Sequence, residues 1–209
     1  MLTSSIPNEG KSTVSFELAR SLTESGKKVL LIDTDMRKSV LIGRLGAALP
    51  EKGEIYGLSH YLSGQKNLSD VLYVTQIPKL FMIFAGPSVP NPTEILEKRS
   101  FAELIAFAKE QFDYVLIDCA PIGVAIDAAV VAKHCDGAIL VIAQGMAGSR
   151  MIMETKEQLE TSGVRILGAV LNKVKMENSH YGKYYGRYYG NYYNDYQKEE
   201  SEGKKEGEA

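Results

Sequence analysis

The sequence predicts an α/β fold in which helices flank a mostly parallel sheet. Short apolar runs alternate with longer amphipathic stretches from Val29 onward, a pattern typical of β/α units around a buried sheet. A chain of 209 residues with 44% hydrophobic content is long enough for one domain with a buried core. The periodicity stops after Lys175. We therefore expect one domain over residues 1–174 and a tail over residues 175–209.

The individual elements follow from this alternation. The expected strands are the apolar runs at residues 29–32, 80–85, 114–117, 138–143 and 166–171. The expected helices are the amphipathic stretches at residues 11–25, 57–62, 92–111, 125–134 and 149–162. Gly26 and Gly163 stand where glycine commonly ends a helix.

Composition excludes several classes of function. The net charge of −2 and pI of about 6.0 give no basic field for nucleic acid, so we expect no nucleic-acid partner. No apolar run approaches 18 residues and the start has no signal pattern, so we expect a chain that neither spans a membrane nor is exported. Cys119 and Cys135 lie in apolar surroundings, which suits reduced thiols of a cytosolic protein.

The segment "SSIPNEGKST" matches the phosphate-binding pattern G-x-x-x-x-G-K-[ST] with one departure, Ser5 in place of the first glycine. Backbone N–H groups of such a loop, together with the helix that follows, form a cradle for anions. Lys11 would reach the β- and γ-phosphates, and the Ser12 hydroxyl would bind Mg²⁺. The alternative is a helix start that happens to contain Gly-Lys-Ser. The residues expected at the nucleotide are Pro7, Asn8, Glu9, Gly10, Lys11, Ser12 and Thr13.

Carboxylates follow two of the apolar runs. "VLLIDTDMR" ends in Asp33 and Asp35 followed by Arg37, and "YVLIDCAP" places Asp118 three residues before Pro121. Ligands in open α/β sheets bind at the carboxyl ends of strands, so these acids would face the same crevice as the phosphate loop. Each acid alone could equally meet solvent or cap a helix. Their combination with the phosphate loop favours a nucleotide site.

The end of the chain is rich in tyrosine. Eight of the 12 tyrosines recur there in a Tyr-Tyr-Gly-x rhythm: Tyr181, Tyr184, Tyr185, Tyr188, Tyr189, Tyr192, Tyr193 and Tyr196. The following "KEESEGKKEGEA" is too polar to bury anything. The composition predicts a disordered tail, either a sticky low-complexity segment or a substrate that can reach an active site.

These motifs together resemble the bacterial tyrosine kinases of capsule and exopolysaccharide assembly. The resemblance covers nearly the whole chain, including "AGPSVPNPTEIL" before a predicted helix. It implies a P-loop NTPase-like fold and an ATP-dependent, Mg²⁺-requiring tyrosine autokinase that regulates polysaccharide synthesis and export. The tail tyrosines would then be its phosphoacceptors, normally reached by a neighbouring subunit.

The resemblance also implies roles for the acids. Asp33 would be the base or orienting group for the tyrosine hydroxyl, while Asp35 and Asp118 would hold Mg²⁺. A free tyrosine has a pKa of about 10, so a carboxylate must accept or guide its proton as bonding begins. Asn172, after the last strand, would read the adenine edge, although asparagine is also an ordinary turn residue there.

The resemblance further implies partners and a location. We expect a separate transmembrane activator of the polysaccharide co-polymerase type, a cognate tyrosine phosphatase, and a cytoplasmic position at the inner face of the cell membrane through the activator. A homo-oligomer is expected, but the Glu-x-x-Arg-x-x-Arg motif that assembles a ring in this family is not in this chain. Residues 1–4 alone precede the phosphate loop, so the first strand is expected to be truncated or frayed. Asn8 replaces a glycine of the family and tolerates positive φ well.

Two alternatives remain at this point. One is a MinD/ParA-like positioning or partition ATPase. Such proteins carry a lysine five residues before the phosphate-loop lysine, where this chain has Ile6, and they lack a tyrosine tail. The other is a non-catalytic scaffold whose short first strand has cost it affinity for ATP.

Overall fold

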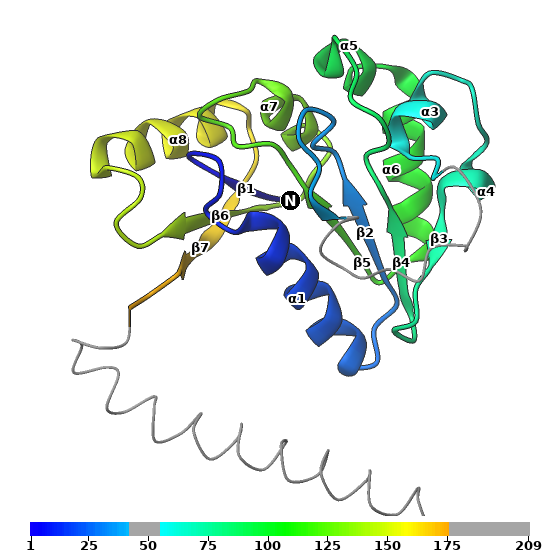
Figure 1. The fold of residues 1–209 in the computed structure, drawn as a ribbon, viewed down its shortest axis with the longest axis horizontal. Helices are drawn as coiled ribbons and strands as arrows, with labels where there is room; N and C mark the ends of the chain where they lie inside the picture. The colour runs from blue at the N-terminus through cyan, green and yellow to red at the C-terminus, as the bar shows by residue number, and fades with distance from the viewer. Residues whose placement is uncertain (42–54, 176–209) are drawn as a thin grey trace, which may run out of the picture. The chain divides into compact units, whose positions relative to one another are not determined.

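The structure, a computed structural model, describes residues 1–41 and 55–175. In this part of the chain, a sheet in the order β3-β4-β2-β5-β1-β6-β7 carries helices on both faces (Figure 1). Met1–Lys173 form one compact unit. The predicted α/β fold with a mostly parallel sheet is confirmed, while the predicted tail and its tyrosines lie outside the described residues.

The strands are β1 (Leu2–Ser4), β2 (Val29–Asp33), β3 (Tyr73–Val74), β4 (Leu80–Ile83), β5 (Tyr114–Asp118), β6 (Ala138–Ala143) and β7 (Ile166–Asn172). The helices are α1 (Lys11–Glu24), α3 (Leu58–Leu62), α4 (Leu68–Val71), α5 (Pro92–Leu96), α6 (Arg99–Gln111), α7 (Asp127–Ala132) and α8 (Ser149–Thr161). Every strand pairing is parallel except that of β3 with β4. Within the described ranges, none of the helices is both long and apolar enough to cross a membrane.

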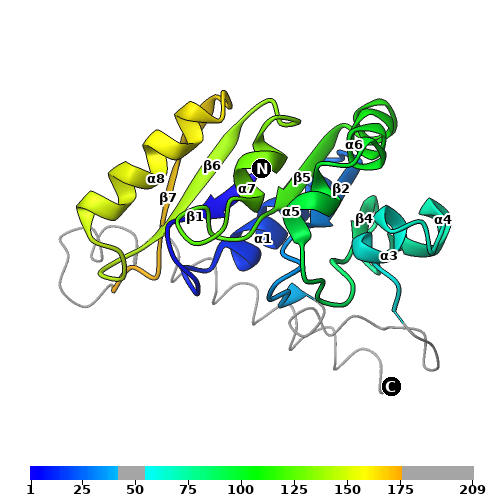
Figure 2. The ribbon, with the colours of Figure 1, turned by 90° about the horizontal axis from the view of Figure 1, so that it is seen from above.

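The alternation of side chains along β2 builds two cores. Leu30 and Ile32 belong to the core beneath α5, α6, α7 and α8, whereas Val29 and Leu31 belong to the core beneath α1. Figure 2 shows α1 on one side of the sheet and α6 and α8 on the other. Since both faces are covered, a central strand must be apolar on both faces, which is why β2 reads as a continuous hydrophobic run.

β1 is short but lies inside the sheet, between β5 and β6. It pairs in parallel with both β5 and β6, and all three of its residues are buried. The amino group of Met1 donates to Gly137 O at 2.8 Å, and Thr3 Oγ1 donates to Ala120 O at 2.8 Å. Pairing on both sides satisfies the backbone over this short length, so the expectation of a frayed edge is wrong.

The helix expected at residues 92–111 is two helices. Lys98 has extended backbone angles, φ −63° and ψ 147°, and separates α5 from α6. Its Nζ donates to Leu62 O at 3.1 Å, which ties the break to α3. Leu96 and Phe101, on either side of the break, are both fully buried. The change of direction therefore lets both helices bury their apolar faces, a tertiary effect that periodicity cannot reveal.

Candidate active site

The loop between β1 and α1 is held by a buried carboxylate. Glu9 Oε2 accepts hydrogen bonds from Ser5 N at 2.8 Å and Ile6 N at 2.9 Å, and Oε1 accepts one from Ala143 N at 3.0 Å. The side chain is completely buried. Its charge is therefore directed at the protein backbone, so Glu9 braces the loop and could face a nucleotide only through its own backbone.

Two residues of this loop have left-handed backbone conformations. Asn8 has φ 66° and Gly10 has φ 92°. A Cβ on Gly10 would lie 2.2 Å from Asn172 Nδ2, which itself donates to Glu9 O at 2.9 Å. The backbone angle thus favours glycine at position 10, and a side chain there would also displace the Asn172 amide. Asn172 lies against the loop, and its contact with adenine remains a prediction.

Ser5, which replaces the first glycine of the motif, fits within the protein. Its side chain is completely buried, and a Cβ on Gly123 would lie 2.3 Å from Ser5 O. The segment after β5 therefore approaches the loop backbone closely. Glycine at position 123 therefore leaves room for the Ser5 carbonyl, while the Ser5 hydroxyl is buried without a hydrogen-bond partner among the described residues.

The predicted acids meet at the carboxyl ends of β2 and β5. Asp33 stands opposite Asp118 in register. Lys11 Nζ lies 3.1 Å from Asp35 Oδ2 and 3.9 Å from Asp118 Oδ2. All four side chains are buried. The structure thus gathers these four groups in one place beside the loop.

Hydrogen bonds orient the carboxylates. Asp33 Oδ1 accepts from Asp35 N at 2.9 Å, and Oδ2 accepts from Ser39 Oγ at 2.6 Å. Ser15 Oγ lies 3.1 Å from Asp118 Oδ1 and 2.9 Å from Lys11 O, so its one hydrogen is shared between these two acceptors. Neither Ser15 nor Ser39 stood out in the sequence, although Ser15 lies one helical turn after Lys11, which places it on the same face of α1.

Burial and crowding alter the acidity of this cluster. Burial, followed by the neighbouring Asp118 carboxylate, raises the pKa of Asp33 to about 7, although the Ser39 hydrogen bond acts in the opposite direction. Burial also raises the pKa of Asp118, against the lowering effect of the Lys11 ammonium. Burial disfavours the charged form of Lys11, but Asp118 and Asp35 outweigh it and raise the pKa of Lys11.

A small cavity of about 90 Å³ opens between the loop and the acids. Its lining residues are Pro7, Asn8, Gly10, Lys11, Ser12, Asp35, Lys38, Val40 and Pro121. Of the residues predicted at the nucleotide, Glu9 is turned inward, and Thr13 is exposed on α1 outside this cavity. Loop N–H groups, an ammonium and a carboxylate therefore face the same small space, an arrangement that suits a phosphate.

The oxygen atoms at this site also fit Mg²⁺. Among the described residues, no group of three or more His, Cys, Asp or Glu side chains could hold a metal ion by itself. Mg²⁺ usually binds through one or two carboxylates plus waters and substrate phosphates, so such a cage is not needed. Ser12 and Asp35, which line the phosphate cavity, and Asp118 beside them carry hard oxygen atoms of the kind that Mg²⁺ prefers.

A second polar cluster adjoins the site. Arg37 Nε donates to Asp127 Oδ2 at 2.6 Å and Nη2 donates to Oδ1 at 3.1 Å, while Thr93 Oγ1 also donates to Asp127. Asp127 is buried. This bidentate pair links the segment after β2 to α5 and α7. The sequence shows Arg37 beside the acids, but no spacing pairs it with Asp127.

Comparisons with known proteins agree with this geometry. Residues 8–165 match the family described as AAA domain. The chain is 43% identical over 183 residues to the tyrosine-protein kinase CpsD of Streptococcus agalactiae, covering 88% of this chain and 78% of the relative. The kinase domain of the Escherichia coli tyrosine kinase ETK superposes with a TM-score of 0.79 at 32% identity, covering 86% of this chain and 68% of that one. The septum site-determining protein MinD of Pyrococcus horikoshii, complexed with Mg-ADP, superposes with a TM-score of 0.67 at 28% identity, covering 81% of this chain and 68% of that one.

Proposed function

Because this chain belongs to the tyrosine-protein kinases of which CpsD and ETK are members, we propose that it transfers the γ-phosphoryl group of ATP to tyrosines of its own tail, residues 181–196, in a neighbouring copy. The observation that carries the proposal is the convergence of Lys11 with Asp35 and Asp118 beside the phosphate loop. The enzyme class is protein-tyrosine kinase, which converts ATP and a protein tyrosine into ADP and phosphotyrosine.

The loop and Lys11 would bind the phosphates. Backbone N–H groups of the loop and the N-terminus of α1 attract anions, and Lys11 lies at the first position of that helix. Glu9 keeps the loop in its shape through three backbone hydrogen bonds. The phosphates would therefore meet a cradle that is already formed, so little binding energy is lost to ordering it.

Ser12, Asp35 and Asp118 would hold Mg²⁺. When bound there, Mg²⁺ neutralises charge on the phosphate oxygens. The MinD relative is complexed with Mg-ADP, which supports a nucleotide and this metal for this chain. Ser15 would keep the Asp118 carboxylate oriented, since it already donates to Oδ1.

Asp33 would handle the proton of the tyrosine. The new bond forms between the tyrosine oxygen and the γ-phosphorus, the bond to the bridging oxygen of ADP breaks, and the phenolic proton passes to Asp33. A pKa of about 7 suits this role, because a base works best when its pKa lies near the working pH. Ser39 and the Asp35 backbone fix the direction of the carboxylate.

The proposed partners, location and biological role are taken from the family to which the chain belongs. We propose that the kinase works with a separate transmembrane activator and a tyrosine phosphatase, at the inner face of the membrane, and that it regulates capsular or exopolysaccharide synthesis and export. A homo-oligomer would bring the tail of one copy to the site of another.

A mixing experiment tests the transfer between copies. The donor of the tail is the Lys11→Met chain, which cannot use ATP, and the enzyme is the chain with its eight tail tyrosines changed to phenylalanine. With Mg-ATP and the activator, we expect phosphotyrosine on the donor. ATP turnover without any label on the donor would instead favour a MinD-like ATPase.

A further inference from the structure

A groove of about 870 Å³ lies outside the phosphate site, between α5, α7 and α8. Ile122, Ala129 and Val130 form part of its apolar lining. Val124 and Ile126, which also line it, are 64% and 66% exposed. Apolar side chains of this size, gathered in a concave surface, are typical of a binding site.

The groove adjoins the candidate active site. Pro121 lines the phosphate cavity and the next residue, Ile122, lines the groove. Thr93, on the wall of the groove, shares Asp127 with Arg37, which follows Asp35 by two residues. A peptide lying in the groove would therefore pass beside the segment that carries the catalytic acids.

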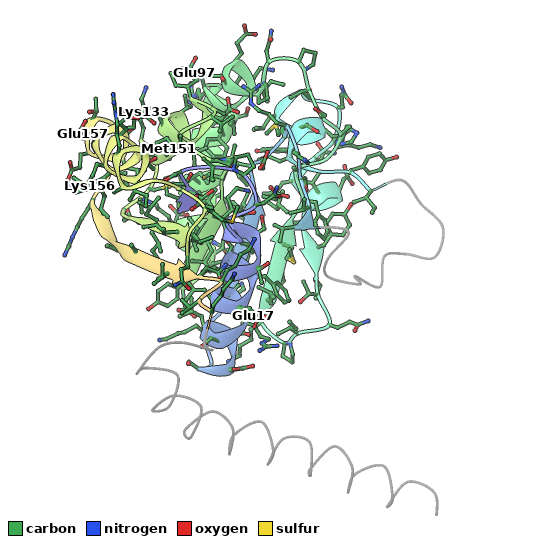
Figure 3. The ribbon with its side chains drawn as sticks, turned by 60° about the vertical axis from the view of Figure 1, so that its left-hand side comes forward. Glu17, Glu97, Lys133, Met151, Lys156 and Glu157 are labelled. Carbon is green, nitrogen blue, oxygen red and sulfur yellow. The ribbon has the colours of Figure 1, made fainter. Side chains whose placement is uncertain are left out.

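The rim of the groove is mainly acidic. Glu97, Lys133 and Glu157, labelled in Figure 3, lie on or next to α5, α7 and α8 respectively. Within the described part of the chain, none of the three has an ion-pair partner. Glu154, the remaining carboxylate, is paired with Arg150 at 2.9 Å. Two free carboxylates against one free ammonium favour a ligand that is basic and apolar.

We propose that this groove docks the unphosphorylated tyrosine segment, residues 180–193, of a second copy of the chain. The inference rests on the proposed function and adds how that substrate is recognised. The segment carries seven tyrosines, two basic residues, Lys183 and Arg187, and no acid. Its rings match the apolar lining and its cations match Glu97 and Glu157.

The negative charge of the groove would also release the tail once it is phosphorylated. Each phosphotyrosine adds about −1.5 to −2 charges at neutral pH. A phosphorylated segment would therefore be repelled by Glu97 and Glu157, where the unmodified one was attracted. The groove thus distinguishes substrate from product by charge, and a labelled tail gives way to an unlabelled one.

Binding of a synthetic peptide tests the proposal without relying on catalysis. The probe is a fluorescent peptide of residues 180–193, titrated with the full chain and followed by anisotropy. We expect the double reversal Glu97→Lys with Glu157→Lys to weaken binding by about tenfold, as loss and reversal of two surface charge contacts predict. The charge control, Glu17→Lys with Glu24→Lys, changes the net charge equally on α1, where both carboxylates pair with Arg20, and should shift binding by less than about twofold.

Further variants and peptides test whether the peptide binds in the groove. A peptide with Lys183→Glu and Arg187→Glu should regain affinity for the Glu97→Lys, Glu157→Lys chain, because the pairs are restored with reversed signs. Val124→Asp should weaken binding of the unmodified peptide. Val74→Asp, at a position 77% exposed on β3, should leave its affinity unchanged. A peptide phosphorylated on Tyr184 and Tyr185 should bind at least about tenfold more weakly.

The inference is overturned if the peptide does not bind, if the α1 control weakens binding as much as the groove variant, or if the phosphopeptide binds more tightly. These outcomes are separate from failure of the proposed function. A peptide that docks in the groove while the donor tail is never labelled would contradict the kinase assignment and leave the groove assignment standing. Labelling of the donor tail by the Glu97→Lys, Glu157→Lys chain with an unchanged KM would contradict the groove assignment and leave the kinase assignment standing.

Discussion

Asp33 and Asp118 stand opposite each other in register on the parallel strands β2 and β5, and both are buried. The sheet therefore places two carboxylates side by side at the edge where the phosphate loop begins. Lys11 contacts Asp118 and Asp35 and reaches neither oxygen of Asp33 within 4 Å. Burial and the neighbouring Asp118 carboxylate raise the pKa of Asp33 to about 7, whereas Asp35 and Asp118 are the carboxylates that lie next to the positive charge.

Lys11→Met should abolish phosphorylation of the tail. The lysine is the cation expected at the transferred phosphate, and its loss also leaves Asp35 and Asp118 uncompensated. Removing one partner of a buried pair costs about 3–5 kcal/mol, so the nucleotide-free variant should also be less stable. Urea denaturation measures the second effect and anti-phosphotyrosine blotting the first. A variant that is folded at the assay temperature and labels its tail like the parent would refute the role of Lys11.

Asp33→Asn and Asp118→Asn should fail in different ways. Asp33→Asn removes the proposed proton acceptor and should lower the rate of transfer by about 10²–10⁴-fold, with nucleotide affinity unchanged. Asp118→Asn should weaken the dependence of nucleotide binding on Mg²⁺. Binding of a fluorescent ATP analogue, titrated with Mg²⁺, separates the two. Equal losses of binding and transfer in both variants would remove the ground for giving them different roles.

The stability of the nucleotide-free and metal-free protein should fall as the pH rises from about 4 to 7. Because the folded-state pKa of Asp33 is raised to about 7 from its ordinary value of 3.8, the folded state binds more protons than the unfolded state over this interval. Asp33→Asn should flatten this part of the profile. A parent profile that rises between pH 4 and 7, with no difference in Asp33→Asn, would contradict the raised pKa.

Gly10→Ala should weaken nucleotide binding by deforming the phosphate loop. The new Cβ would meet Asn172 Nδ2 at 2.2 Å in addition to the strain of φ 92°. Gly26→Ala is a matched control, since Gly26 has φ 84° but nothing within 4 Å of the added Cβ. Calorimetric titration with ADP should show a loss for Gly10→Ala alone, partly recovered when Asn172→Ala is added. Equal affinities in the two alanine variants would show that the contact does not shape the loop.

Full phosphorylation of the tail should separate the copies of the kinase. Modification of most of the eight tyrosines adds on the order of −10 charge to the segment, which would then repel the acidic groove and the other tails over about 8 Å at physiological salt. Light scattering of the chain with its activator, before and after exhaustive labelling, measures the assembly. The variant with eight phenylalanines should remain assembled under both conditions. An assembly equally large before and after labelling would point to a docking role for the phosphotyrosines.

The sequence was sufficient where one pattern decides the structure. Continuous apolar runs predicted β2 and β5, and the strand-end acids predicted the meeting of Asp33 with Asp118. The sequence was insufficient where contacts between residues far apart in the chain decide the structure. The break at Lys98 depends on α3, and the pairing of Arg37 with Asp127 depends on how α7 lies against the end of β2. Short elements such as β3 and α4 carry too few residues to show a period.

The central claim is tested most directly by mass spectrometry of the tail. The full chain is incubated with its activator, Mg²⁺ and ATP, digested, and the peptide that contains Tyr181 to Tyr196 is analysed. We predict several phosphotyrosines on this peptide in the parent and none in Lys11→Met. Hydrolysis of ATP by the parent with a fully unmodified tail peptide would contradict it.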